Sequence, residues 1–267
     1  MVIRNIIYQV LQQAEDILGA RKRLQPQTDI VVILGGTSTL FGQRLCQLLV
    51  HKFKTTLVNV DRHDDPSLHN GGPYYFFQCD FSKRESVNGA LKSLKRKGLR
   101  YTVLINNLNE YMDSAEGNDT FQYCTSVFNA HLINVMIFTR TFVTQLVRPV
   151  DDIYIINVTR YQDTKIGGPK YATYHQLAQA GLIQYHDGLS SELQLKEINN
   201  GNDYKSLLVH IPMDNNRREE EYACQVLEML QEGRKGVQYI GANSFGIIMP
   251  YYWINCVRDF YTLCRSE

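Results

Sequence analysis

Short apolar runs alternate with amphipathic helical patterns through most of the chain, from residue 29 to about residue 260. The runs are rich in Val, Ile and Tyr and nearly continuous in hydrophobicity, which is typical of strands whose sheet is covered on both faces. The seven runs are Ile30–Leu34, Thr56–Val60, Tyr74–Gln78, Tyr101–Ile105, Ile153–Val158, Ser206–Ile211 and Val237–Ile240. The helical patterns are Phe41–Lys52, Ser82–Lys97, Thr120–Val147, Lys170–Leu195 and Arg217–Glu232. This alternation predicts right-handed β-α-β units and an α/β fold with one doubly wound parallel sheet of about seven strands.

Two segments flank this core, so we expect three parts: 1–27, 28–245 and 246–267. The first part carries apolar residues at helical spacing and then a basic run, which predicts an amphipathic helix that closes before Pro26. That helix packs on the core or on a second subunit, or else it lies on a membrane surface. The last part is rich in aromatic residues, which more often close a core or an interface than contact lipid. They are Tyr251, Tyr252, Trp253, Phe260 and Tyr261.

The charge balance and the cysteine pattern exclude several classes of protein. The 28 Lys and Arg residues nearly equal the 27 Asp and Glu residues, so the net charge of +1 predicts no nucleic-acid partner. The longest apolar stretch, residues 246–257, contains Pro250 and Asn255 and is too short for a transmembrane span. The six cysteines form no CxxC pair and no signal-peptide pattern opens the chain, so we expect a cytoplasmic protein with buried thiols. The seven histidines lack metal-ligand spacing, so no metal site is expected.

A glycine-bearing turn follows the first predicted strand and opens a helical pattern. In Gly35-Gly36-Thr37-Ser38-Thr39-Leu40-Phe41-Gly42, backbone N–H groups and a helix N-terminus can approach a pyrophosphate, as in Rossmann-type dinucleotide sites. Asp61 ends the second strand about 20 residues beyond Gly42, where an acid usually binds the adenosine ribose hydroxyls. The alternative is a turn that needs glycine for packing alone.

Several segments, in this order, resemble the short-chain dehydrogenase/reductase family. Those near the turn and the crevice are Gly36-x-x-x-Leu40-x-Gly42, Cys79-Asp80-Phe81-Ser82 and Leu104-Ile105-Asn106-Asn107-Leu108-Asn109. Further along, Ile155–Arg160 is similar to the family's serine-bearing strand, and Ala180–Ile183 to its active-site helix. The resemblance implies a single Rossmann-type domain that binds NAD or NADP. The cofactor-binding residues that it implies are Gly36, Thr37, Ser38, Phe41, Gly42, Asp61, Asp80 and Asn106.

Three residues bear on the choice and the strength of binding of this cofactor. Leu40 stands where the family has the middle glycine of the turn, and its side chain crowds the closest backbone approach to the phosphates. This departure weakens the expectation of bound NAD or NADP. Asp61 favours NAD because a carboxylate repels a 2′-phosphate, whereas Arg62 beside it can accommodate one.

All four catalytic positions that the resemblance implies are substituted. His175 stands at the position of the family's Tyr and Gln179 at that of its Lys. The Ser position falls on or near Arg160, with Thr159 beside it, and His131 stands at the Asn. In the family the Tyr acts on the substrate oxygen as an acid or base, and the Lys lowers its pKa. Glutamine cannot supply that positive charge.

Two hypotheses about function follow from these substitutions. In the first, the protein is catalytically degenerate and acts as a binding, scaffold or sensor protein, with a homo-oligomer or another protein as partner. In the second, it is a divergent NAD(P)-dependent oxidoreductase that acts on a lipid-like alcohol or carbonyl, with His175, Tyr171 or Tyr174 as the acid. Both hypotheses are compatible with a protein that contacts a membrane surface peripherally.

Overall fold

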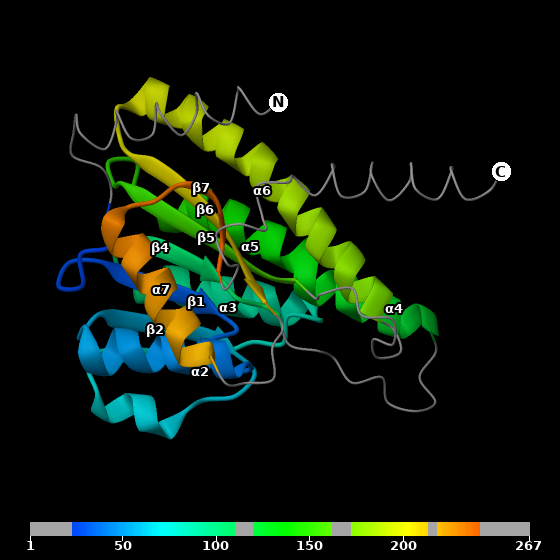
Figure 1. Ribbon diagram of the computed structural model, residues 1–267. Coiled ribbons are helices and arrows are strands. Elements are labelled where there is room, and N and C mark those ends of the chain that lie inside the picture. Colours follow the sequence, from blue (N-terminus) through cyan, green and yellow to red (C-terminus); the bar gives the residue numbers. More distant parts are fainter. Residues whose placement is uncertain (1–22, 110–119, 162–171, 213–217, 241–267) are drawn as a thin grey trace.

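A sheet of seven parallel strands forms the centre of the protein (Figure 1). The computed structural model describes residues 23–109, 120–161, 172–212 and 218–240. The strands are β1 (Ile30–Leu34), β2 (Thr56–Asp61), β3 (Tyr74–Gln78), β4 (Tyr101–Asn106), β5 (Ile153–Tyr161), β6 (Tyr204–Pro212) and β7 (Gly236–Tyr239). Their order in the sheet is β3-β2-β1-β4-β5-β6-β7. The predicted α/β fold of Rossmann type, with its seven strands in one domain, is confirmed.

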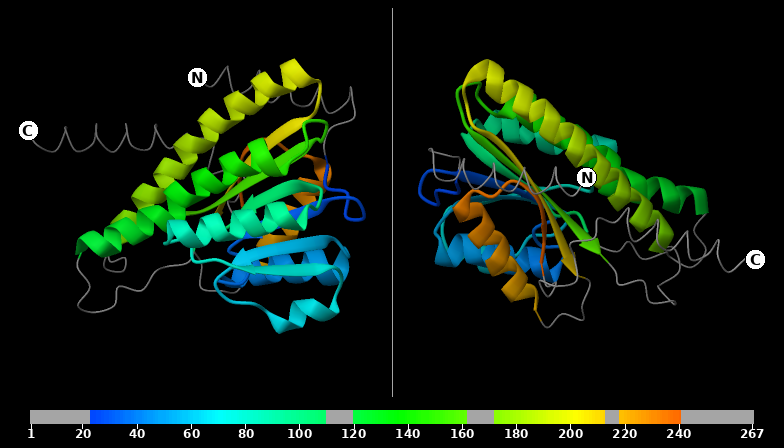
Figure 2. Two further views of the ribbon diagram at one scale, coloured as in Figure 1. Left: turned by 180° about the vertical axis from the view of Figure 1, so that it is seen from behind. Right: turned by 45° about the horizontal axis from the view of Figure 1, so that its top comes forward.

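Helices cover both faces of this sheet (Figures 1 and 2). The α-helices are α2 (Leu40–Gln47), α3 (Arg84–Lys97), α4 (Thr120–Phe128), α5 (Asn134–Thr141), α6 (Ala172–Asn200) and α7 (Glu219–Glu232). Helices α2 and α7 pack together on one face, whereas α3, α5 and α6 cover the other. Short π-helical segments are Leu48–Lys52, Asn129–Ile133 and Phe142–Leu146, and a 3-10 turn is Pro66–Asn70.

The inner strands contribute side chains to both layers of the core. In β1, Val31 and Ile33 pack beneath α2 and α7, whereas Val32 and Leu34 pack on the side of α3 and α5. All four side chains are fully buried. Because successive residues of a strand point to opposite faces, a strand covered on both faces reads as a continuous apolar run.

The predicted helix Thr120–Val147 is observed as a continuous helical stretch that ends at Leu146 and contains two π-helical segments. The π-helical segment Asn129–Ile133 separates α4 from α5. A π turn holds one residue more than an α turn and therefore rotates the following residues about the helix axis. Within this segment the neighbours Ala130 and His131 are both buried.

Some predicted features fall on residues that the structure does not describe. The apolar part of the predicted N-terminal helix, the aromatic C-terminal segment and Tyr171 lie outside the described residues. Helix α6 is described from Ala172 and continues to Asn200, past its predicted end at Leu195. None of the helices within the described ranges combines the length and the hydrophobicity needed to cross a membrane.

The strand order places a crevice at the carboxyl edge of the sheet. From β1 the chain proceeds outward through β2 to β3, and it then crosses to β4 on the other side of β1. The loops after β1 and β4 therefore diverge, which is the place where ligands bind in open parallel sheets. The glycine-bearing turn follows β1, and Asn107 follows β4.

Cysteine reactivity tests this packing. Cys46 and Cys79 are buried, and burial raises the pKa of Cys79 to about 12 and that of Cys46 further still. Cys124 and Cys224 are only half-buried. Since the thiolate is the reactive form, we expect iodoacetamide to label Cys124 and Cys224 in the native protein and the buried pair only after unfolding. Peptide mass mapping gives the result, and native-state labelling of Cys46 as fast as that of Cys224 would contradict the packing of α2.

Candidate functional site

Close packing explains the glycines of the turn after β1. Gly35 has a φ of +76°, and a Cβ at this residue would lie 2.7 Å from the backbone oxygen of Asn107. A Cβ on Gly36 would lie 2.6 Å from Asn59 Oδ1, and one on Gly42 would lie 2.7 Å from Asn107 Nδ2. Packing is therefore a sufficient reason for each of these glycines, which was one of the two alternatives that the sequence left open.

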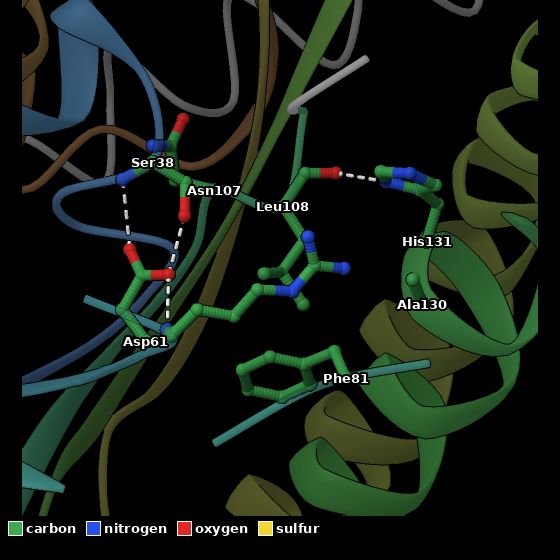
Figure 3. Close-up of a pocket in the computed structure, with 8 residues that line it drawn as sticks. Ser38, Asp61, Phe81, Asn107, Leu108, Ala130 and His131 are labelled. Atoms are coloured by element: carbon green, nitrogen blue, oxygen red, sulfur yellow. Dashed lines mark hydrogen bonds between the residues drawn. The ribbon is translucent and has the colours of Figure 1, made fainter. Parts of the chain in front are cut away.

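The Asp61 carboxylate, at the end of β2, occupies the N–H groups of the turn (Figure 3). Its Oδ2 accepts hydrogen bonds from the backbone N–H groups of Thr37 at 2.8 Å and Ser38 at 2.9 Å, and from the Thr37 hydroxyl at 3.0 Å. Its Oδ1 accepts from the Ser38 hydroxyl and from the N–H of Arg62. The single hydrogen of the Thr37 hydroxyl can go instead to the His63 carbonyl, at 2.5 Å. A carboxylate has about four lone-pair positions, so the other four donors are enough to saturate it. In this arrangement Asp61 has no acceptor left for a ribose hydroxyl.

The start of α2 joins the turn to the loop after β4. The N-cap Thr39 accepts a hydrogen bond from the N–H of Gly42 at 3.0 Å and another from Asn107 Nδ2 at 3.1 Å. Leu40 is half-buried at the first residue of the helix, and the Phe41 side chain is fully buried in the core. A cofactor contact at Phe41 is therefore restricted to its backbone.

The cavity beside Asp61 and Arg62 in the crevice is small. Its volume is about 20 Å³, which is close to the space that one water molecule needs. The residues that line it are Ser38, Asp61, Arg62, Phe81, Asn107, Leu108, Ala130 and His131 (Figure 3). The enclosed part of this cavity is therefore too small for an adenine ring.

Asp80, which the resemblance places at the adenine, forms a network after β3. Its Oδ1 accepts from the Ser82 N–H at 3.0 Å and the Ser82 hydroxyl at 2.7 Å, and it lies 3.5 Å from Arg62 Nε. Lys83 Nζ lies 3.3 Å from Oδ2. Partial burial acts to raise the pKa of Asp80, but the Ser82 hydrogen bonds and the charges of Arg62 and Lys83 hold it below its usual value. Asp80 is therefore an ionised acceptor beside the cavity residue Arg62.

Asn106 belongs to a buried polar network instead of the crevice surface. Its Nδ2 donates to Thr139 Oγ1 at 3.0 Å and to Asn157 Oδ1 at 2.6 Å, which joins β4 to α5 and β5. Asn157 Nδ2 in turn lies 2.9 Å from His186 Nδ1 on α6. The sequence reasoning missed His186. The available signal was Asn157 itself, since a polar residue inside an apolar strand needs a buried partner.

His131 and His175, which the resemblance aligns with two catalytic positions, lie side by side. Their ring centroids are 4.8 Å apart, and the Tyr123 hydroxyl lies 3.2 Å from His175 Nε2. His131 Nδ1 donates to the Leu108 carbonyl at 2.7 Å (Figure 3). Burial lowers the pKa of His131 to about 4 and also lowers that of His175. Both rings are therefore neutral at pH 7.

Arg160 and Gln179, at the other two catalytic positions, also meet. Gln179 Oε1 accepts from the backbone N–H of Arg160 at 3.2 Å. The Arg160 guanidinium forms two hydrogen bonds with Glu219, from Nη1 at 2.7 Å and from Nη2 at 2.9 Å, and Nη1 also donates to the Pro212 carbonyl at 3.3 Å. Only 9% of the Arg160 side chain and 4% of the Glu219 side chain are exposed. Glu219 belongs to the acidic first turn of α7, yet its side chain is buried.

The described part of the chain contains no group of three or more His, Cys, Asp or Glu side chains that could hold a metal ion. Many polar groups near the crevice are bonded to one another, but the buried His131 Nε2 has no hydrogen-bond partner among the described residues. What this arrangement offers chemically is a set of neutral imidazoles, one buried ion pair and a glycine turn that already holds a carboxylate.

Solved structures share this arrangement of sheet and crevice. A short-chain dehydrogenase from Streptomyces avermitilis matches with a TM-score of 0.68 at 15% sequence identity, over 91% of this chain and 98% of that one. The protein has the short-chain dehydrogenase fold. An oxidoreductase of the short-chain dehydrogenase/reductase family from Brucella ovis, solved in complex with a partially ordered NAD, matches with a TM-score of 0.62. Its sequence identity is 16%, over 80% of this chain and 99% of that one.

The chain is also similar in sequence to the oxidoreductase-like protein SRL4 of Saccharomyces cerevisiae. The two are 25% identical over 261 residues, which cover 88% of this chain and 92% of SRL4. No protein-family model matches the chain. The resemblance predicted from the sequence motifs is thus confirmed for the fold, and function has to be argued from the site.

Proposed function

We propose that this protein keeps the short-chain dehydrogenase fold without the hydride-transfer chemistry, and that it acts as a binding, scaffold or sensor protein. The observation that carries the proposal is the ion pair of Arg160. At the position of the family's Ser, which donates a hydrogen bond to the substrate oxygen, the side chain is locked onto Glu219 and the Pro212 carbonyl. A buried charge held in this way is costly to detach from its partner.

The proton donor supplies a second argument. A general acid works best when its pKa lies near the working pH. His175 is largely neutral there because burial lowers its pKa, and a neutral imidazole is a poor acid. Gln179, at the position of the family's Lys, carries no charge and spends its Oε1 on the N–H of Arg160.

We further propose that a nicotinamide dinucleotide binds only weakly. The turn at the start of α2, with Asp61 and Asp80 nearby, supplies the groups for such a ligand, and the Brucella ovis protein was solved with NAD. Two features oppose binding: Asp61 already occupies the N–H groups of Thr37 and Ser38, and the cavity beside it measures about 20 Å³. Rotation of Asp61 and movement of Arg62 must precede entry of the adenosine part.

Calorimetric titration with NADH and NADPH tests this proposal. We expect dissociation constants on the order of 0.1–1 mM, since only the fraction of molecules with Asp61 displaced is competent to bind. With a panel of aldehydes and ketones we expect no oxidation of either nucleotide. Turnover that His175→Ala abolishes, but that the matched variant of the exposed His69, His69→Ala, retains, would overturn the proposal.

The second candidate is a divergent NAD(P)-dependent oxidoreductase that acts on a lipid-like alcohol or carbonyl. One contact favours it: the Tyr123 hydroxyl lies 3.2 Å from His175 Nε2, so a phenol and an imidazole meet at the position of the catalytic Tyr. Tyr174, one of the acids considered from sequence, packs against Tyr123 with ring centroids 6.3 Å apart. Turnover by the parent protein that His175→Ala abolishes would establish this candidate.

The setting of the protein is also a proposal. Cys46 and Cys79 are reduced and buried, which supports a cytoplasmic location. A second copy or another protein as partner is part of the proposal, and the exposed Leu195 and Ile198 near the end of α6 are one place for such a contact. Sedimentation of the purified chain gives the oligomeric state.

A further inference from the structure

A second cavity lies at the opposite edge of the sheet from the crevice. It has a volume of about 240 Å³ and lies between the end of α3, the start of β4 and the segment after Leu146. The crevice lies at the carboxyl ends of the parallel strands, whereas Arg100 and Tyr101, which line this cavity, lie at the amino end of β4. No residue is shared between the two cavities.

Two arginines at this cavity are held by one buried carboxylate. Asp151 is 1% exposed, and its Oδ1 accepts from Arg100 Nε at 2.8 Å and Nη2 at 2.7 Å. Arg148 Nε lies 3.0 Å from Oδ2, and Arg148 Nη2 lies 3.3 Å from Oδ1. Burial acts to raise the pKa of Asp151, but the hydrogen bonds and charges of the two arginines hold it below its usual value. Asp151 therefore stays ionised and fixes both guanidinium groups.

Each guanidinium keeps donors for a ligand. About half of each arginine side chain is exposed, and Nη1 of Arg100 and of Arg148 makes no hydrogen bond to any residue in the described part of the chain. Because Asp151 already orders these side chains, a ligand would lose little of its binding free energy to freezing them. Planar guanidinium groups held in this way suit the oxygens of a phosphate.

Charge and shape define the ligand further. Lys95 adds a third cation to the lining, and no acidic side chain lines the cavity. Asp29 and Asp152 act on Arg100 only at longer range than Asp151. The apolar part of the cavity wall is formed by Leu94, Leu99 and Leu146. Three cations beside the single Asp151 carboxylate leave an excess of two positive charges, so the site matches a ligand with close to two negative charges. The cavity volume exceeds the volume of a bare phosphate ion.

We propose that this cavity binds a small phosphate monoester. Arg100 and Arg148 donate to the phosphate oxygens, Lys95 balances the remaining charge, and the leucines contact the organic group. A phosphate monoester carries about −1.5 to −2 charges at pH 7, which fits the cation set. The site is separate from the crevice, so it does not depend on the function proposed above.

Calorimetric titration with phenyl phosphate at constant ionic strength tests the proposal. Inorganic phosphate and phenol serve as the two half-ligands. We expect saturable binding of phenyl phosphate that is about tenfold tighter than that of inorganic phosphate, because the leucines contact the ring. Arg148→Gln should weaken binding about tenfold or more, whereas Arg140→Gln, which breaks an exposed ion pair with Glu192 elsewhere, should leave it unchanged.

A second variant keeps the test valid if Arg148→Gln unfolds. Gln145→Glu adds a negative charge to the lining and leaves both partners of Asp151 in place. It should abolish binding of phenyl phosphate while the thermal unfolding midpoint stays near that of the parent. The proposal is overturned by the absence of saturable binding, by equal losses in the Arg140 and Arg148 variants, or by equal affinities for inorganic phosphate and phenyl phosphate.

Discussion

Lowering the pH from about 7 to about 4.5 is expected to destabilise the protein by an amount comparable to its whole stability. Burial lowers the pKa values of His131, His186 and His210 to about 4 each. In the unfolded chain these imidazoles titrate near pH 6.5, so between pH 6.5 and pH 4 the unfolded state binds more protons. Stability is therefore complete above pH 6.5 and falls as the pH falls through this window. Each histidine contributes about 3 kcal/mol, against a usual total of about 5–15 kcal/mol.

Urea unfolding at several pH values across this window measures the effect. His210→Gln should flatten the pH dependence, because His210 packs against Tyr239 with ring centroids 4.5 Å apart and takes no proton in the folded state near neutral pH. The matched control is His69→Gln, since the His69 side chain is 51% exposed. If the parent keeps the same free energy of unfolding at pH 7 and pH 5, these histidines are not buried as described.

Breaking the Arg160–Glu219 ion pair from one side is expected to cost about 3–5 kcal/mol of unfolding free energy. Arg160→Met removes the cation and leaves the Glu219 carboxylate, which is 4% exposed, without its partner. The double variant Arg160→Met with Glu219→Leu removes both charges, so it should recover most of the loss. Urea unfolding of the parent, the two single variants and the double variant gives the coupling energy directly.

An exposed ion pair provides the control for this cycle. Arg140 and Glu192 join α5 to α6 with side chains that are 62% and 58% exposed. Arg140→Met should therefore change the unfolding free energy by less than about 1 kcal/mol. A similarly small effect of Arg160→Met would contradict the burial of the Glu219 carboxylate.

The sheet was predictable because burial on both faces leaves a signal in single strands. The predicted starts and ends of β1 and β3 agree with the structure. Strand β5 was predicted to end at Val158 but continues to Tyr161. The polar residues Thr159 and Arg160 extend it, and their partners, His210 and Glu219, lie 51 and 59 residues further along the chain. A local pattern carries no information about such distant partners.

The candidate site was predictable in its location and less so in its contacts. The turn after β1 and Asp61 lie together, as the motifs indicated, whereas the contact between His131 and His175 was not foreseen. The direction of the Asp61 side chain depends on which donors surround it in three dimensions, and the sequence could not tell a carboxylate that faces a ribose from one that faces the turn. Likewise, the place of Asn106 in a buried network depends on His186, which lies on a helix whose exposed and buried faces the pattern does not separate clearly.

The Asp61 carboxylate acts as an intramolecular anion that occupies the N–H groups of the turn. A group attached through the chain next to its binding site is present at an effective concentration of millimolar or more, whatever the concentration of the protein. Any free anion that approaches Thr37 and Ser38 competes with this permanent occupant. If a nucleotide binds as proposed above, its phosphate replaces the Asp61 carboxylate at these N–H groups. The nucleotide concentration needed for half-occupancy would then be higher than the intrinsic dissociation constant of the N–H groups.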